Sequence, residues 1–333
     1  MIDVAIIGAG LMGRWHLAAA KVAGGRITAI VDQDLNAARL LARSAPEAAI
    51  AADIADLPSG LARVAHICVP TDLHAPTAVV AASKRMAAFV EKPIAADAQE
   101  AQRLYDAAGD LGALVCPVHQ YAFQSGLEQV LARLKDLETL RCIAFDIRSA
   151  GADAGRIKPN ALIADILPHP LSVLQRLRPD IRLADLRWSA EATTGELLCT
   201  TQYNGLMISI RTSANARPPC FQTLVIGDRG SAAVDGFHGY AAFSSGRVAR
   251  SAKLTAPFRE AAAHFGAAAV NLASRALRRE FAYPGLAALT RRFYSAVAKG
   301  DPAASPITQT TAIDNAAARD QLCVFLQASR GVR

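Results

Sequence analysis

Short apolar runs alternate with helical patterns through the first third of the chain. Five of these runs predict strands, at residues 2–7, 26–31, 64–69, 87–90 and 113–116. Between the last two, Asp97 is followed three residues later by Glu100, a capping-box-like start for a helix that runs to about Gly109. Alternating strands and helices are typical of a parallel sheet covered on both faces. Residues 1–120 are therefore expected to form one α/β domain.

The pattern changes after a predicted helix at residues 126–137. Strand-like runs follow at residues 140–149, 181–190, 196–203, 206–212, 222–226 and 232–234, and a further helix is expected after Pro170. The Asn204-Gly205 pair between two of these runs is typical of a hairpin turn. Strands interrupted by a helix predict a second, α+β domain at residues 121–333, with a large, open and mostly antiparallel sheet. The tail from Leu286 is again helical, and its last helix, at about residues 310–330, can return to pack on the first domain.

A glycine motif directly follows the first predicted strand. In the segment VAIIGAGLMGRWH, Gly8 allows a tight turn, Gly10 lets the backbone approach a pyrophosphate, and Gly13 permits close packing of helix on strand. The helix that begins at Leu11 and Met12 offers unpaired N–H groups to phosphates. Strand, glycine motif and helix in this order predict a doubly wound, dinucleotide-binding Rossmann domain.

An acidic residue completes this pattern. Asp32 lies nineteen residues beyond Gly13, at the end of the second predicted strand, where a carboxylate can accept both ribose hydroxyls of NAD. Its charge would repel the 2′-phosphate of NADP, and the next residue, Gln33, brings no positive charge. NAD is therefore the expected cofactor, with NADP disfavoured. The alternative is a glycine turn and a surface Asp with no cofactor.

Further polar clusters follow the ends of the predicted strands, where open parallel sheets bind their ligands. They are Pro70 to His74, the Glu91-Lys92 pair, and His119 with Gln120. Taken alone, His74 is also explained as a loop or helix-cap residue, and Glu91-Lys92-Pro93 as a surface turn. At the ligand edge of the sheet, however, the Lys92 ammonium could stabilise negative charge that develops on a substrate oxygen.

The motifs GAGLMGRWH, ICVPTDLH and VEKP, in this order and at this spacing, resemble the N-terminal domain of the glucose-fructose oxidoreductase / inositol dehydrogenase / MocA family. The resemblance implies that Lys92 contacts the nicotinamide ribose and the reacting substrate oxygen, while Glu91 helps to fix the ribose. In the second domain, ALIADILPHPLSVL resembles the segment with the family's Asp-x-x-x-His pair. The resemblance implies that His169 is the acid/base and that Asp165 binds the substrate. A histidine also suits proton exchange near neutral pH.

Two segments depart from the family's pattern. Many members carry an arginine-phenylalanine pair near the substrate, where this chain has Ala122 before Phe123. This difference argues against an unmodified simple-sugar specificity. The long basic region at residues 247–283 does not match the family's common core, whereas the later segment VIGDRGSAAVDGF resembles the family's strand–turn–strand.

The sequence thus predicts a cofactor site and a substrate site. The residues expected to contact the cofactor are Gly8, Gly10, Leu11, Met12, Gly13, Asp32, Pro70, His74, Glu91 and Lys92. The residues expected to contact the substrate are Lys92, His119, Gln120, Asp165 and His169, of which Lys92, Asp165 and His169 are the catalytic set. No metal is expected.

These residues predict an oxidoreductase that moves a hydride between a substrate carbinol carbon and C4 of nicotinamide. Lys92 would polarise the oxygen and His169 would exchange its proton. The expected substrate is a sugar, cyclitol or nucleotide-linked sugar, because vicinal hydroxyls suit a Lys, Asp and His cluster. Two alternatives use the same fold: an imine or conjugated-bond reductase, which need not depend on a Lys/His pair, and a non-catalytic NAD-binding regulatory or scaffold protein.

The net charge of +7 favours an anionic partner, which could be a small substrate, a nucleic acid or an anionic membrane surface. Much of the excess lies in one stretch, at Arg247, Arg250, Lys253, Arg259, Arg275, Arg278 and Arg279. No aromatic residues interleave regularly with these charges for base stacking, so a nucleic acid is not expected. A solvated helical face explains the stretch most simply. Contact with an acidic substrate tail, a neighbouring subunit or a membrane surface stays open.

The six cysteines are scattered singly, without metal-ligand spacing, so neither disulfides nor structural zinc is expected. No apolar run reaches the length of a membrane span and no basic leader precedes the first strand, so a cytoplasmic location is expected. An open sheet with one uncovered face would expose more apolar surface than a monomer usually tolerates. A homodimer or homotetramer is therefore predicted.

Overall fold

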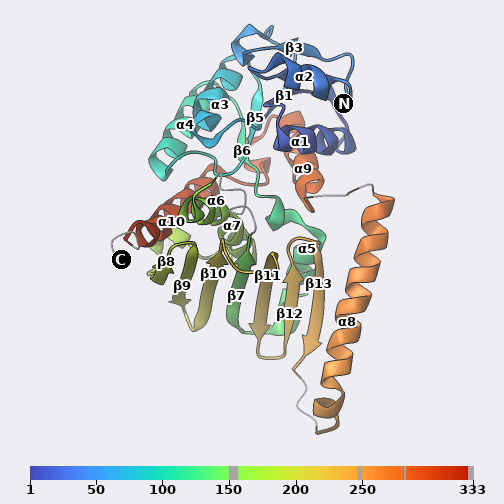
Figure 1. Ribbon diagram of the computed structural model, residues 1–333, viewed down its shortest axis with the longest axis vertical. Coiled ribbons are helices and arrows are strands. Elements are labelled where there is room, and N and C mark those ends of the chain that lie inside the picture. The colour runs from blue at the N-terminus through green and yellow to red at the C-terminus, as the bar shows by residue number, and fades with distance from the viewer. Residues whose placement is uncertain (150–156, 247–249, 279, 281–282, 329–333) are drawn as a thin grey trace. The chain divides into compact units, whose positions relative to one another are not determined.

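The chain forms two compact units in the computed structural model (Figure 1). The structure describes residues 1–149, 157–246, 250–278, 280 and 283–328. The first unit comprises Met1–His119 and Leu286–Ala317, and the second comprises Gln120–Gly285 and Ala318–Arg333. Arg247 and Arg279 of the basic stretch, and residues 329–330 of the predicted last helix, lie outside the described residues.

The first unit is built on a six-stranded parallel sheet with the order β3-β2-β1-β4-β5-β6. Its strands are β1 (Ile2–Ile7), β2 (Gly25–Val31), β3 (Ala49–Ala51), β4 (Val64–Ile67), β5 (Ala87–Val90) and β6 (Val115–Pro117). Strand β1 pairs with β2 on one side and with β4 on the other, so the direction of winding reverses there. In such sheets, ligands bind outside the carboxyl ends of the strands at this point. The topology confirms the predicted Rossmann domain.

Helices cover this sheet. They are α1 (Leu11–Val22), α2 (Leu35–Ala42), α3 (His74–Ser83), α4 (Ala98–Asp110) and α9 (Leu286–Lys299). Every residue of β4 and β5 is buried, as expected when both faces of a parallel sheet are covered. Asp97 caps α4 by accepting from the Glu100 N–H at 2.7 Å, and the Glu100 carboxylate accepts from the Ala96 N–H at 2.7 Å. These bonds confirm the predicted start of this helix.

The second unit contains a seven-stranded sheet with the order β13-β12-β11-β7-β10-β9-β8. Its strands are β7 (Leu140–Arg148), β8 (Ser189–Thr193), β9 (Glu196–Tyr203), β10 (Leu206–Ser213), β11 (Cys220–Gly227), β12 (Gly230–Asp235) and β13 (Tyr240–Ser245). Only β7 and β10 pair in parallel, and the other neighbours are antiparallel. The mostly antiparallel sheet confirms the predicted fold of this part of the chain.

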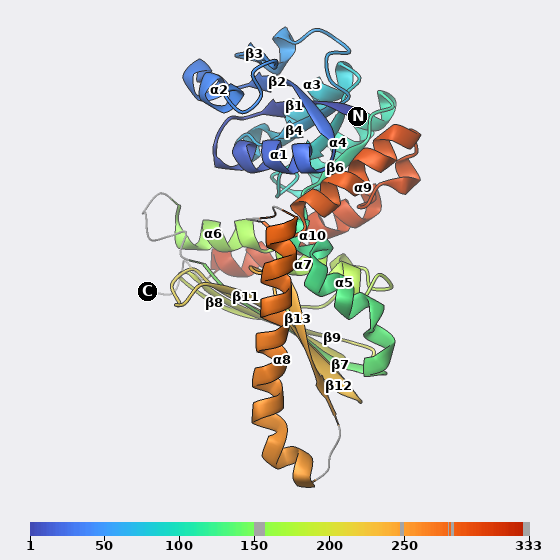
Figure 2. The ribbon, with the colours of Figure 1, turned by 90° about the vertical axis from the view of Figure 1, so that its right-hand side faces the viewer.

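One face of this sheet carries the core of the second unit. The helices of the unit are α5 (Ser125–Ala132), α6 (Pro159–Ile166), α7 (Pro168–Leu177), α8 (Arg250–Leu277) and the end of α10 (Gln309–Ala328). Figure 2 shows the sheet close to edge-on, with α5, α6 and α7 on one side of it. Phe145 and Ile210 pack there with Leu174 of α7 and Leu322 of α10. Alternate strand residues point away from this core, and Leu198, Met207 and Leu224 are among those that stay exposed.

Several predicted elements differ from the observed ones. The strand expected at residues 181–190 is wrong: Leu183–Asp185 is a 3₁₀ turn, and β8 begins at Ser189. Ile181 and Leu183 are both buried, so their alternation imitates a strand in the sequence. The helix expected at residues 126–137 is interrupted after Ala132, and a 3₁₀ turn follows at Leu134–Leu137. Strands β3 and β13 and helix α6 were not predicted.

Candidate active site

The glycine loop between β1 and α1 leaves room for a ligand at one position and is tightly packed at two others. Gly8 adopts φ +98°, in the left-handed region that favours glycine, and a Cβ there would lie 2.6 Å from the carbonyl oxygen of Cys68. A Cβ on Gly13 would collide with the Gly8 carbonyl oxygen. A Cβ on Gly10, in contrast, would meet no atom within 4 Å. The loop is therefore closed against the sheet and open in front of the helix.

The N-terminus of α1 faces this open position. Gly10 is its N-cap residue and forms no side-chain capping bond. Leu11 is exposed and Met12 is half-buried, and the first turn contains no acidic residue. The first N–H groups of a helix attract anions such as phosphates. This geometry fits the pyrophosphate of a dinucleotide.

Asp32 lies directly after β2 and is bonded to the same loop. Its Oδ2 accepts from the Ala9 N–H at 2.7 Å, and its Oδ1 accepts from the Asp34 N–H at 2.9 Å. The side chain is half-buried, so the carboxylate keeps an exposed edge. The structure thus brings Asp32 and the glycine loop together at the carboxyl ends of β1 and β2.

The Glu91-Lys92-Pro93 turn follows β5 and is held at both ends. The Lys92 N–H donates to Oε2 of Glu91 at 3.1 Å, and the Pro93 carbonyl oxygen lies 2.6 Å from Nδ1 of His74. The other ring nitrogen of His74 lies 2.9 Å from the Val69 carbonyl oxygen, in the loop after β4. His74 is buried at the start of α3, so its ring ties these two loops together. Lys92 is half-buried and extends from a backbone that is fixed on both sides.

A chain of four buried polar side chains ends at this turn. The Tyr294 hydroxyl lies 2.8 Å from Nε2 of His66, and Nδ1 of His66 lies 2.9 Å from Nδ1 of His16. Nε2 of His16 lies 2.8 Å from Oε1 of Glu91. The four residues come from α9, β4, α1 and the end of β5, and each is at most 5% exposed. The network therefore joins four separate elements of the first unit in a dry environment.

The pKa directions indicate the charge states of Tyr294 and His66 in this network. Burial raises the pKa of Tyr294, so its hydroxyl keeps its proton. Burial, together with the cost of a second imidazolium beside His16, holds the pKa of His66 well below its usual range. The neutral His66 ring has one proton, so it donates from one ring nitrogen and accepts at the other. His16 donates from Nε2 to Glu91, because an ionised carboxylate can only accept.

Glu91, at the end of this hydrogen-bonded network, is an ionised carboxylate. Burial raises the pKa of Glu91, but the hydrogen bond and attraction of His16, followed by the charge of Lys92, outweigh burial and bring the pKa below its usual value. Each carboxylate oxygen accepts a hydrogen bond, Oε1 from His16 and Oε2 from the Lys92 N–H. A buried charge is stable only when it is bonded in this way. The network thus holds one negative charge beside the Lys92 backbone.

Pro70 and His119 lie at the same edge of the sheet of the first unit, and Gln120 opens the second unit. Pro70 is exposed and precedes a 3₁₀ turn after β4. His119 is buried after β6, and the boundary between the two units falls between it and Gln120. Gln120 is also buried, and its Oε1 has no hydrogen-bond partner among the described residues. A buried acceptor of this kind suits a ligand donor.

The predicted pair in the second unit lies on one helical face. Asp165 is in α6, His169 is in α7, and both helices meet at Leu167, which keeps helical φ and ψ. Residues four apart on a helical path share a face. Pro168 has no N–H to bond the Ala164 carbonyl, and that carbonyl accepts from Nε of Arg319 in α10 at 3.1 Å instead.

His169 is packed tightly in this position. Its ring is buried, and the Tyr121 ring meets it edge-on at a centroid distance of 4.6 Å. The Ser172 hydroxyl donates to the His169 carbonyl oxygen at 2.8 Å. Asp165 is half-buried. The structure therefore fixes the orientation of the His169 imidazole while the Asp165 carboxylate keeps access to solvent.

Three residues of the buried network were not assigned a role from the sequence. His16 stands within the glycine motif segment, three residues after Gly13, and this position is a signal that could have pointed to it. His66 is an isolated polar residue inside a buried strand, and Tyr294 lies 228 residues further along the chain. Neither has a local pattern that indicates a contact with the Glu-Lys-Pro turn.

In the part of the chain that the structure describes, no group of three or more His, Cys, Asp or Glu side chains could hold a metal ion. The described helices also include none that is both long and apolar enough to cross a membrane. All six cysteines are free thiols.

Comparison with solved structures supports the same fold over the whole chain. The UDP-N-acetylglucosamine 3-dehydrogenase of Acidithiobacillus ferrooxidans superposes with a TM-score of 0.74 at 18% identity, covering 98% of both chains. A 3-ketoreductase from Actinomadura kijaniata, solved with NADP and TDP-benzene, gives 0.74 at 16% identity and 98% coverage of both chains. An Agrobacterium radiobacter oxidoreductase, solved with NAD⁺, L-tartaric acid and magnesium, gives 0.72 at 16% identity, covering 98% of this chain and 96% of that one.

Sequence comparison finds a family model for the first domain. No curated protein gives a significant sequence match to the chain. Residues 2–119 match the family model described as "Oxidoreductase family, NAD-binding Rossmann fold". The N-terminal domain therefore matches the NAD-binding domain of the glucose-fructose oxidoreductase / inositol dehydrogenase / MocA family, which its motifs resemble.

Proposed function

We propose that the protein is an NAD-dependent dehydrogenase or reductase that acts on a hydroxyl or keto carbon of a sugar, cyclitol or nucleotide-linked sugar. The observation that carries this proposal is the fixed Glu-Lys-Pro turn. Lys92 N–H is bonded to a buried carboxylate and the Pro93 carbonyl lies against His74, so the Lys92 side chain starts from one defined position. A positioned ammonium can stabilise developing negative charge without reorganising during the reaction.

NAD fits the first unit because the open space at Gly10 and the uncapped N-terminus of α1 can receive a pyrophosphate. Gly8, Gly10, Leu11, Met12 and Gly13 would surround the phosphates, and Asp32 would bind the ribose hydroxyls. When bound, NAD accepts or supplies the hydride. Asp32 disfavours NADP because its carboxylate would repel the 2′-phosphate.

The protein's own groups handle the oxygen and its proton. In our proposal, the Lys92 ammonium stabilises the substrate oxygen while negative charge develops on it, and His169 removes or returns the proton. Asp165, one helical turn before His169, orients the substrate hydroxyls or His169. Gln120 contributes its buried acceptor Oε1. Glu91 acts on Lys92 through the backbone N–H that it accepts.

The substrate class is supported by the type of side chains and by two similar folds. Lys92, Asp165 and His169 combine donors and acceptors that suit vicinal hydroxyls. The Acidithiobacillus ferrooxidans protein acts on a UDP-linked amino sugar, and the Actinomadura kijaniata protein was solved with a TDP derivative. We therefore place nucleotide-linked sugars first among the candidates, and an anionic diphosphate would also suit the positive net charge of the chain.

The oligomeric state and the location are part of the proposal. A dimer or tetramer formed through the outer face of the second sheet would cover Leu198, Met207 and Leu224. Light scattering that finds a monomer at micromolar concentration would count against this assembly. A cytoplasmic location is supported by the free thiols of all six cysteines.

The test is a screen of nucleotide sugars, aldoses and cyclitols with NAD⁺ and with NADP⁺, read as absorbance of the reduced nicotinamide. We expect at least one substrate to be oxidised faster with NAD⁺, and the activity to be lost in Lys92→Ala. Turnover of imines but of no alcohol would make the protein a reductase of the other class. Tight NAD binding without turnover of any substrate would make it a regulatory or scaffold protein.

A further inference from the structure

Helix α8 presents one apolar side to solvent. It runs along β13, the edge strand of the second sheet, as both ribbon views show (Figures 1 and 2). Leu254, Phe258, Phe265 and Leu272 follow one another at intervals of four, seven and seven residues, which places them on one side of a helix. Their exposed fractions are 81%, 78%, 78% and 71%. We call these four side chains the α8 stripe.

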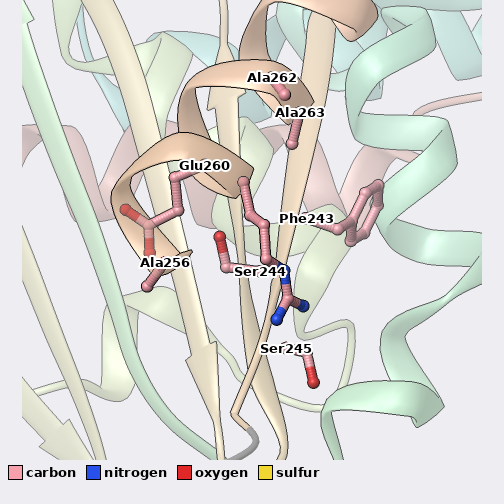
Figure 3. Close-up of a pocket in the computed structure, with 8 residues that line it drawn as sticks. Phe243, Ser244, Ser245, Ala256, Glu260, Ala262 and Ala263 are labelled. Carbon is pink, nitrogen blue, oxygen red and sulfur yellow. The ribbon is translucent and has the colours of Figure 1, made fainter. Parts of the chain in front are cut away.

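The opposite side of α8 faces the sheet. Asn271 donates from Nδ2 to the His238 carbonyl oxygen at 2.8 Å, and the His264 ring meets the Tyr240 ring at a centroid distance of 6.4 Å. Further along, Glu260 and Ala263 line a groove of about 480 Å³ against β13, shown in Figure 3. The α8 stripe is therefore not the surface by which the helix packs on its own unit.

The exposed area is large for a surface that stays in water. An aromatic side chain covers about 150–250 Å², so the two phenylalanines and two leucines together expose on the order of 500 Å² of apolar surface. Patches of this size on soluble proteins often mark interaction sites. The stripe runs from Leu254 to Leu272, a rise of about 27 Å along a helix. A continuous apolar strip of this length needs a partner that is equally long and apolar.

The charge around the stripe identifies the chemistry of that partner. The region 247–283 has seven basic and two acidic residues, so it carries five of the seven net positive charges of the chain. Arg250 and Lys253 precede the stripe in sequence, and Arg275 and Arg278 follow it. Of the acids, Glu260 lines the groove against β13, and Glu280 lies 3.6 Å from the Arg278 guanidinium. The helix is thus apolar on one side and basic at both ends.

We propose that α8 docks on the surface of an anionic lipid bilayer, with the stripe inserted at the level of the lipid headgroups. Such a surface satisfies both features, because it accepts phenylalanine and leucine side chains and attracts arginine and lysine. A second copy of the chain satisfies only the first feature. Pairing two stripes would bring two basic helices together, and like charges oppose such contacts. The inference is independent of the proposed activity.

The experiment is flotation of the full chain with vesicles. One set is phosphatidylcholine alone, and in the other set half of this lipid is replaced by phosphatidylglycerol. We expect the chain to bind the anionic vesicles at least about tenfold more strongly than the neutral ones, and to be released by high salt. The double variant Phe258→Ser/Phe265→Ser should lose about tenfold or more of this binding, since it removes both aromatic side chains from the stripe.

A matched control replaces exposed leucines elsewhere. Leu40 and Leu111 are 48% and 47% exposed in the first unit, and Leu40→Ser/Leu111→Ser should bind anionic vesicles as the wild type does. Circular dichroism should show unchanged helix content in both double variants, because all four positions are exposed.

Three outcomes overturn the proposal. They are no binding to anionic vesicles, equal binding to both vesicle types, and undiminished binding of the Phe258→Ser/Phe265→Ser variant. If light scattering shows a dimer that this variant dissociates, while the wild type does not bind vesicles, the stripe is instead an interface between two copies of the chain.

Discussion

Removing the Tyr294 hydroxyl tests the buried network most simply. Tyr294→Phe keeps the ring and deletes the hydroxyl that lies 2.8 Å from Nε2 of His66. The loss cannot be repaired by moving protons. Whether His66 carries its proton on Nδ1 or on Nε2, its Nε2 atom has lost its partner. One buried nitrogen therefore stays unsatisfied, which typically costs about 1–3 kcal/mol.

The chain offers a matched control in the same unit. Tyr105 is also buried, at 7% exposure against 5% for Tyr294, but its hydroxyl has no hydrogen-bond partner among the described residues. Tyr105→Phe removes the same atom without breaking a bond, so it should change the free energy of unfolding by no more than about 0.5 kcal/mol or should stabilise the protein.

The assay is urea unfolding followed by tryptophan fluorescence. The chain has two tryptophans, Trp15 in α1 of the first unit and Trp188 in the second. In a Trp188→Phe background, the signal reports the first unit alone, and the free energies of unfolding of Tyr294→Phe and Tyr105→Phe can be compared directly. Equal free energies for the two variants would refute the hydrogen-bond chain as an energetic unit.

Three further predictions concern the buried imidazole and the cofactor loop. The folded-state pKa of His66 lies well below its usual 6.5, so the unfolded chain takes up this proton at a higher pH than the folded chain does. As the pH decreases from 6.5, the free energy of unfolding of the wild type should therefore decrease more steeply than that of His66→Gln. Parallel curves of unfolding free energy against pH would disprove this. Gly10→Ala should keep wild-type stability and bind NADH roughly tenfold more weakly in a fluorescence titration, whereas Gly13→Ala should lose about 1–3 kcal/mol of stability. A Gly10→Ala variant that loses stability, together with a Gly13→Ala variant that does not, would contradict the loop geometry. Asp32→Ala should narrow or reverse the preference for NAD over NADP, measured as the ratio of dissociation constants, and equal affinities in the wild type would count against the role of Asp32.

The first unit could be predicted in detail because its signals are local. The strand at residues 87–90 and the capping of α4 by Asp97 depend on neighbours within a few positions, and both match the structure. The conformation of the glycine loop depends on three glycines within six consecutive residues. The unpredicted β3 is three residues long, and its pattern, with no fully buried residue, resembles a surface loop.

The network behind Lys92 could not be predicted because its members are joined only by folding. His66 lies inside an apolar strand, and a histidine in such a pattern is interpreted as an ordinary core residue. Tyr294 reaches it from α9, and nothing near residue 294 indicates a polar partner. The motif VEKP identified Lys92 from sequence, while what fixes its backbone depends on contacts between distant elements.

We propose that Lys92 and His169 serve one reacting oxygen, and a comparison of kcat with NADH affinity tests this proposal most directly. Once a substrate is known, Lys92→Ala and His169→Ala should each lower kcat by about 10²–10⁴-fold while NADH affinity changes little. In the oxidation direction, the wild-type rate should rise with pH as the His169 imidazole becomes a proton acceptor, and this rise should be absent in His169→Ala. Near-normal kcat in both variants would contradict the proposed mechanism.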